Sequence, residues 1–191
     1  MTLVMDCKKQ LSGMNAIGTR FPDVNIITNK VHQDDRGSFL ETFNLREIQR
    51  IIGSYNFVQD CCSISKKNVI RGLHYQIEHP QGKLVRCIRG EIYDVIVDLR
   101  RSSKTFGQWT GFHLGTRSSQ LWIPPGFAHG FSVLSDEAEV QYKLTEYRFP
   151  EYERTLAWND ISLVIDWGVD DPIISDRDLN GQPFIECETY E

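Results

Sequence analysis

The chain has 191 residues, of which 40% are hydrophobic and 25% are charged, a balance typical of a globular protein with a sizeable core. Its formal net charge of −5 argues against general nucleic-acid binding, which needs a basic surface. The sequence shows no apolar run of transmembrane length and no signal-peptide core, and its five cysteines form no C-x-x-C pair, so we expect a cytoplasmic protein with free thiols.

The beginning of the chain yields an expected arm and a helix. Residues 1–20 show no clear period, and we interpret them as a possible N-terminal arm of one domain that spans residues 1–191. A helix is predicted at residues 45–53, because the apolar side chains there are spaced for one helical face and Gly53 supplies a stop.

Strand patterns dominate the rest of the chain. The clearest covers residues 92–99, where every second side chain is apolar and the others alternate isoleucine with aspartate. If this mixed face points inward, Asp94 needs a partner such as Lys83; otherwise the face is solvated. Shorter strands are expected at residues 26–31, 38–43, 84–89, 107–114, 120–123, 131–134, 138–145 and 163–165. Many short strands separated by Gly, Pro and Asp predict an all-β sandwich or barrel with a few short helices.

Residues 124–130 read Pro-Pro-Gly-Phe-Ala-His-Gly, a turn that resembles the second motif of the cupin superfamily. In that superfamily the turn delivers a histidine, here His129, to a jelly-roll β-barrel; the alternative is a surface turn with an incidental histidine. The region matching the first cupin motif has Gln76 where a second metal-binding histidine would stand. His74 and His129 alone are too few for a zinc or iron site, so no metal and no cofactor are expected, although His79 and His113 are unassigned.

Seven sequence blocks, taken together, closely resemble the dTDP-4-dehydrorhamnose 3,5-epimerase family. They occur in the family's order and extend over roughly residues 20–180, which makes the combination specific although each block alone is weak. The blocks are DRGSFLE at 35–41, RGLHYQ at 71–76, PQGKLVR at 80–86, DLRRSS at 98–103, YKLTEY at 142–147, WND at 158–160 and SDRD at 175–178.

The resemblance implies roles for individual residues. His74 would be the general base, and Asp178 would orient it. Tyr142 would protonate the opposite face of the sugar, and Lys83 would lie near the substrate carbonyl. The residues that the resemblance implies for substrate binding are Arg36, Phe39, Glu41, Gln59, Arg71, His129 and Tyr147.

The resemblance also implies a substrate and a partner. The expected reaction inverts C3 and C5 of dTDP-4-dehydro-6-deoxy-D-glucose to give dTDP-4-dehydro-L-rhamnose. Arg71 would meet the ligand or its diphosphate. In such enzymes the N-terminal strand commonly crosses to a second subunit of a homodimer, so Arg36 and Phe39 are expected in the neighbour's site.

Elementary chemistry agrees with these roles. A proton on a carbon beside a ketone is acidic because the negative charge left on that carbon is delocalised onto the carbonyl oxygen, which gives an enolate. Inversion of the carbon needs one acid–base group on each face of the sugar. Strand alternation places His74 and Gln76 on one face but Arg71 on the other. If Arg71 is to face the same site as His74, the strand needs a β-bulge or an end near Gly72.

One segment departs from the family pattern. After Gln59 and Asp60 the family usually has asparagine and a basic residue, whereas this chain has Cys61 and Cys62, which puts the nucleotide contacts in doubt. Several alternatives stay open from sequence alone. They are an epimerase acting at one carbon, a ketoisomerase, a non-catalytic sugar-binding cupin and a metal-dependent cupin oxygenase.

Overall fold

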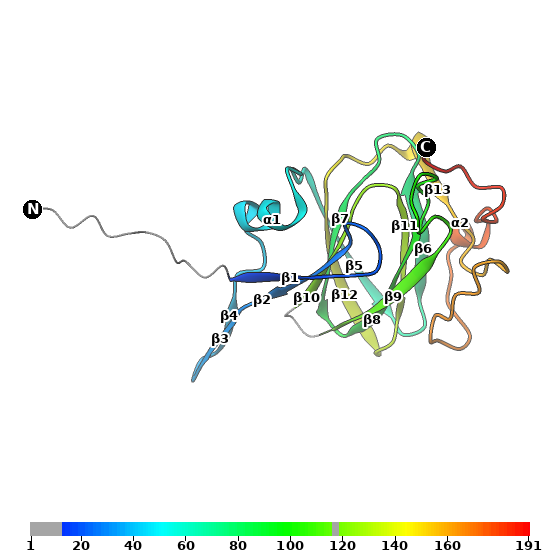
Figure 1. The fold of residues 1–191 in the computed structure, drawn as a ribbon. Helices are drawn as coiled ribbons and strands as arrows, with labels where there is room; N and C mark the ends of the chain where they lie inside the picture. Colours follow the sequence, from blue (N-terminus) through cyan, green and yellow to red (C-terminus); the bar gives the residue numbers. More distant parts are fainter. Residues whose placement is uncertain (1–12, 116–118) are drawn as a thin grey trace, which may run out of the picture.

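The computed structural model describes residues 13–115 and 119–191, which form two facing antiparallel sheets and a separate two-stranded hairpin (Figure 1). The six-stranded sheet contains, in spatial order, β1 (Met14–Gly18), β2 (Asn25–Asn29), β10 (Ser119–Ile123), β7 (Lys83–Arg89), β12 (Glu137–Leu144) and β5 (Gln59–Lys66). The five-stranded sheet contains β13 (Glu153–Thr155), β6 (Ile70–Gln76), β11 (Phe127–Val133), β8 (Glu91–Asp98) and β9 (Trp109–Gly115). The hairpin pairs β3 (Val31–Asp34) with β4 (Gly37–Leu40). This is the predicted all-β jelly roll, with its two sheets not joined into a closed barrel.

Alternating side chains of both sheets fill the space between them. The cluster includes Val85, Cys87, Leu121, Ile123 and Val140 from the six-stranded sheet and Ile92, Ile96, Phe127, Phe131 and Val133 from the five-stranded sheet. On β8, Asp94 and Asp98 share the inward face with isoleucine and are fully buried. The predicted strand at residues 92–99 is therefore confirmed, and the alternative of a solvated mixed face is wrong.

The outer faces of the two sheets are covered as well. Helix α1 (Leu45–Ile52) packs Ile48 against Leu84 and Trp122 on the six-stranded sheet. Its N-cap Asn44 accepts a hydrogen bond from the Glu47 amide, and the helix ends before Gly53, as predicted. The outer face of the five-stranded sheet is covered by the C-terminal segment, which contributes apolar side chains between residues 156 and 190. The described helices include none long and apolar enough to cross a membrane.

The predicted strand at residues 163–165 is wrong. Asp160 accepts hydrogen bonds from the backbone amides of Ser162 and Leu163, which closes a turn at this point. Val164 adopts a left-handed φ of 50°, which a strand does not allow. Leu163 is buried because it packs into the cluster beneath the C-terminal segment, and this burial explains its apolar character.

Several strands lie outside the predicted ranges. Residues 14–18, part of the expected arm, form β1 and pair with β2, whereas residues 1–12 lie outside the described part of the chain. The edge strand β5 alternates between more and less exposed side chains, few of which are apolar, and so gives little hydrophobic signal. The three-residue strand β13 is too short for a periodic pattern.

Candidate active site

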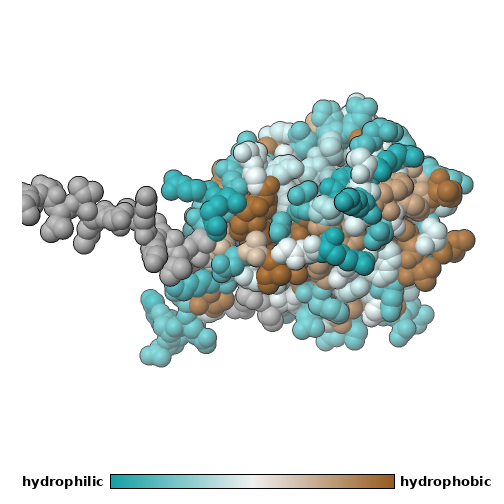
Figure 2. Space-filling view, viewed as in Figure 1, coloured by the Kyte–Doolittle hydropathy of each residue, from teal (hydrophilic) through white to brown (hydrophobic). Residues whose placement is uncertain are grey.

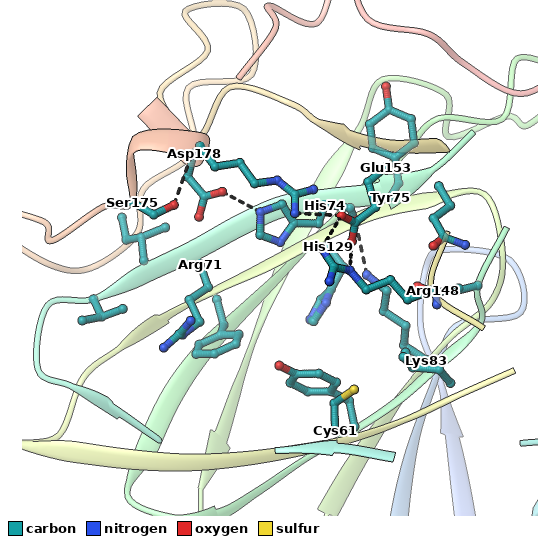
Figure 3. Close-up of a pocket in the computed structure, with 18 of the residues that line it drawn as sticks. Cys61, Arg71, His74, Tyr75, Lys83, His129, Arg148, Glu153, Ser175 and Asp178 are labelled. Carbon is teal, nitrogen blue, oxygen red and sulfur yellow. Dashed lines mark hydrogen bonds and ion pairs between the residues drawn. The ribbon is translucent and has the colours of Figure 1, made fainter. Parts of the chain in front are cut away.

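A cavity of about 620 Å³ lies between the two sheets (Figure 3). Strands β5, β7 and β12 supply one wall, strands β6 and β11 supply the other, and two later segments close the rim. The lining residues are Gln59, Cys61, Val69, Ile70, Arg71, His74, Tyr75, Gln76, Gln81, Lys83, His129, Phe131, Tyr142, Leu144, Arg148, Glu153, Ile173, Ile174, Ser175, Arg177 and Asp178. A cavity of this size can enclose much of a small polar ligand.

A β-bulge at Gly72 brings side chains of β6 into the cavity. His74 pairs with His129 in register, but Arg71 pairs with Phe131, so β6 has one residue more than β11 over this interval. Gly72 adopts a φ of +129°, and a Cβ there would lie 2.5 Å from Gly130 Cα. Only glycine fits this position without strain. The predicted irregularity is confirmed, and as a result Arg71 and His74 both line the cavity.

His74 and Asp178 form a close pair. His74 Nε2 lies 2.6 Å from Asp178 Oδ1, while the backbone amide of Gly72 donates to Asp178 Oδ2 at 3.2 Å. Asp178 lies in the short helix α2 (Asp176–Leu179). The side chain of the N-cap residue Ser175 accepts a hydrogen bond from the backbone amide of Asp178. Burial alone would raise the pKa of Asp178, but the hydrogen bonds from His74 and Gly72 outweigh it and hold the pKa below its usual value.

This pairing selects one tautomer of the imidazole. An ionised Asp178 accepts the proton on Nε2 of His74, which leaves Nδ1 as the basic nitrogen. The side chain of His74 is 32% exposed, so it can reach a ligand in the cavity. The pair therefore has the arrangement that a general base needs, with an oriented ring and a carboxylate placed to stabilise the protonated form.

Tyr142 stands on β12 in the opposite sheet, between its register partners Cys61 and Val85. It lines the same cavity as His74. Burial raises the pKa of the Tyr142 phenol above its usual value, with nearby Arg71 opposing this shift only in part. The phenol therefore keeps its proton at neutral pH and can donate it.

Lys83, Asp94 and His129 lie together in the buried part of the site. Lys83 Nζ donates to the His74 carbonyl at 3.1 Å, and His129 Nε2 lies 2.9 and 3.0 Å from the two Asp94 oxygens. The hydrogen-bond partner of Asp94 is thus His129 and not Lys83, the partner that the sequence suggested. Burial lowers the pKa of Lys83 to about 8 and lowers that of His129, while the charge of Asp94 opposes both shifts.

Four of the candidate substrate-binding residues do not line the cavity of this chain. Arg36, Phe39 and Glu41 belong to the β3–β4 hairpin and its end, which project away from the sheets (Figure 1). Arg36 pairs with Asp34 at 2.6 Å, and Phe39 is 71% exposed. Tyr147 is also exposed, while its carbonyl accepts a hydrogen bond from Gln76. Gln59, Arg71 and His129, in contrast, are among the lining residues.

The cavity is also lined by charged residues for which the sequence predicted no catalytic or binding role. Arg148, Glu153 and Arg177 are joined by hydrogen bonds at the rim. Arg177 lies inside the block that ends at Asp178, so its position there was a usable signal. Arg148 lies in the loop after β12 and Glu153 begins the three-residue strand β13, and neither stretch of sequence has a periodic or motif character. Within residues 13–115 and 119–191, no group of three or more His, Cys, Asp or Glu side chains could hold a metal ion.

A jelly roll whose cavity combines a carboxylate-oriented imidazole, a partly buried phenol and a buried ammonium defines an isomerase of the cupin-like epimerase class. Residues 18–186 match the family model described as dTDP-4-dehydrorhamnose 3,5-epimerase, and the chain belongs to this family.

Named relatives and a solved structure agree with this assignment. A Shigella flexneri dTDP-4-dehydrorhamnose 3,5-epimerase is 51% identical over 180 residues, which cover 93% of this chain and 99% of the relative. A Pseudomonas aeruginosa protein of the same name is 48% identical over 180 residues, with coverage of 93% and 99%. A crystal structure of dTDP-6-deoxy-D-glucose-3,5-epimerase from Legionella pneumophila, in complex with dTDP-4-keto-L-rhamnose, matches with a TM-score of 0.88 and 43% identity. That match covers 92% of this chain and 95% of the other.

Proposed function

We propose that the chain inverts C3 and C5 of dTDP-4-dehydro-6-deoxy-D-glucose and forms dTDP-4-dehydro-L-rhamnose. The observation that carries this proposal is the two-sided cavity, in which His74 and Tyr142 stand on strands of opposite sheets. The Legionella relative, whose crystal structure is a complex with dTDP-4-keto-L-rhamnose, supports the choice of substrate.

In the first half of each inversion, Nδ1 of His74 removes a proton from the carbon beside the C4 ketone. The electron pair of that C–H bond moves into a new C–C double bond, and the carbonyl oxygen becomes an enolate. Asp178 stabilises the imidazolium that results. Lys83 supplies a positive charge near the enolate oxygen, and such a stabiliser contributes about 2.7–4 kcal/mol in comparable sites.

In the second half, the enolate takes a proton on its other face. Tyr142 donates this proton because its phenol is neutral and lies on the wall opposite His74. The carbonyl re-forms, and the carbon has the inverted configuration. C3 and C5 both flank the C4 ketone, so the same residues of one cavity can invert the two carbons one after the other.

We also propose that the active unit is a homodimer in the cytoplasm. The β3–β4 hairpin exposes Phe39 and Val31, and an isolated two-stranded hairpin is marginally stable in water. Packing against a second copy would cover these side chains and carry Arg36 and Phe39 to the partner's cavity. The four described cysteines are free thiols, which fits a reducing compartment.

Incubation with the 4-keto sugar nucleotide in heavy water tests the reaction. We expect deuterium at both C3 and C5 of the product, detected by nuclear magnetic resonance and mass spectrometry. Deuterium at one carbon alone would replace the proposal with a single-carbon epimerase. A protein that binds the substrate and exchanges neither proton would not be an epimerase of this sugar.

A further inference from the structure

Two arginines share the carboxylate of Glu153 at the rim of the cavity, and Figure 3 shows one of them, Arg148, beside Glu153. Arg148 donates through Nε and Nη2 to both oxygens of Glu153, at 3.0 and 2.9 Å. Arg177 donates through Nη1 alone to Glu153 Oε2, at 2.9 Å. A third guanidinium, that of Arg71, lies in the same lining and bonds the Ser65 hydroxyl at 2.9 Å. The rim therefore has more positive than negative charge.

The backbone around Arg148 is held in place from two sides. Its own amide donates to Gln59 Oε1 at 3.1 Å. The buried side-chain amide of Gln76 accepts from the Phe149 amide at 2.7 Å and donates to the Tyr147 carbonyl at 3.2 Å. These bonds tie the segment to β5 and β6, so the guanidinium of Arg148 is directed onto Glu153 by a fixed backbone.

The negative charge of Glu153 would repel an anionic ligand unless an arginine is paired with it. Burial raises the pKa of Glu153, but the hydrogen bonds and charges of Arg148 and Arg177 outweigh this and keep the carboxyl ionised. The two-point bond from Arg148 is stronger than the single bond from Arg177. When an anion enters, Arg177 is therefore the arginine that can change partner, while Arg148 keeps Glu153 paired.

We propose that Arg148 is a positioning residue for the substrate diphosphate: it keeps Glu153 paired, and thereby allows Arg177 to exchange its single bond to Glu153 for bonds to phosphate oxygens. This inference rests on the proposed function, which supplies the diphosphate. In a chain without Arg148, Glu153 would retain Arg177 as its sole arginine partner, and the pair would present no net charge to the ligand.

Binding of dTDP, measured by calorimetry, tests this role without requiring turnover. Replacing one charge-assisted partner typically costs a factor on the order of tenfold or more in affinity, so Arg148→Ala should weaken dTDP binding by about that factor. Adding Glu153→Gln to Arg148→Ala should restore much of the affinity, because the neutral amide no longer retains Arg177. In turnover assays, Arg148→Ala should raise KM more than it lowers kcat.

Arg154→Ala is the matched control. Arg154 is on the same short strand as Glu153, but it pairs with Glu188 and does not line the cavity. We expect the Arg154→Ala variant to bind dTDP with the affinity of the wild-type protein. Equal affinity of wild type and Arg148→Ala would overturn the role of Arg148, as would a double variant that binds as weakly as Arg148→Ala. Failure of the wild-type protein to bind dTDP would overturn the proposed function as well.

Discussion

His74 and Asp178 are separated by 104 positions in the chain, yet their side chains share a hydrogen bond of 2.6 Å. The bond joins a strand of the jelly roll to a short helix of the C-terminal segment. That segment therefore covers the five-stranded sheet and also supplies the carboxylate that bonds the His74 ring.

Replacing the Asp178 carboxylate should impair His74 as a base while preserving the fold. In Asp178→Asn the amide can donate to Nε2 of His74, which favours the wrong tautomer, so turnover should fall by about 10²-fold or more. His74→Ala should give a loss of at least the same order. Steady-state assays check both variants, and Asp176→Asn on the exposed side of the same helix serves as the control. Full activity in Asp178→Asn would rule out its orienting role.

Tyr142→Phe should separate proton exchange from inversion. Because His74 remains intact, protons at C3 and C5 should still exchange with heavy water, whereas formation of inverted product should fall sharply. Nuclear magnetic resonance can follow both processes in one sample. Tyr55→Phe is a suitable control, since Tyr55 packs on Trp122 outside the cavity. Normal inversion by Tyr142→Phe would assign the second proton to another group.

The pH dependence of turnover should report on Lys83. Its pKa of about 8 means that the stabilising positive charge is present below that pH and is lost above it. We therefore expect kcat to decline as the pH rises through about 8. Lys83→Met should have low activity with no decline in this range. A wild-type profile that stays flat to pH 10 would show that the charge of Lys83 is not needed.

Stability should change with pH in the opposite direction. Burial lowers the pKa of Lys83 from 10.5 to about 8, so between these values the unfolded chain binds more protons than the folded one. The cost of burying the charge is fully present below pH 8 and is relieved as the pH rises toward 10.5. Chemical denaturation should show that Lys83→Met loses this increase in the free energy of unfolding. An identical increase in the variant would assign it to other groups.

Gly72→Ala should disrupt the bulge. A Cβ at Gly72 would lie 2.5 Å from Gly130 Cα and 2.9 Å from the His129 carbonyl, and we expect a loss of about 2–4 kcal/mol in the free energy of unfolding. Gly37→Ala is a matched control, because Gly37 has a similar φ of +123° but open space around its Cβ position. Thermal or chemical denaturation should show a clearly smaller loss for Gly37→Ala. Equal losses would mean that backbone strain alone, and not the clash, sets the cost.

Sequence alone predicted the elements whose residues carry a periodic pattern. The strand around Asp94 was evident from alternation, and the helix that ends at Gly53 was evident from its spacing and its stop. The bulge at Gly72 followed from strand alternation together with the family resemblance, because the resemblance required Arg71 and His74 in one site. These inferences succeed because each depends on neighbouring residues.

Only the tertiary structure decided which distant groups meet. Whether Asp94 would bond Lys83 or His129 depends on the register between β8 and β11, which no local pattern specifies. The rim formed by Arg148, Glu153 and Arg177 likewise depends on a turn and a helix that approach each other through folding. Local periodicity reports which face of an element is buried, whereas partnership between buried charges is set by long-range packing.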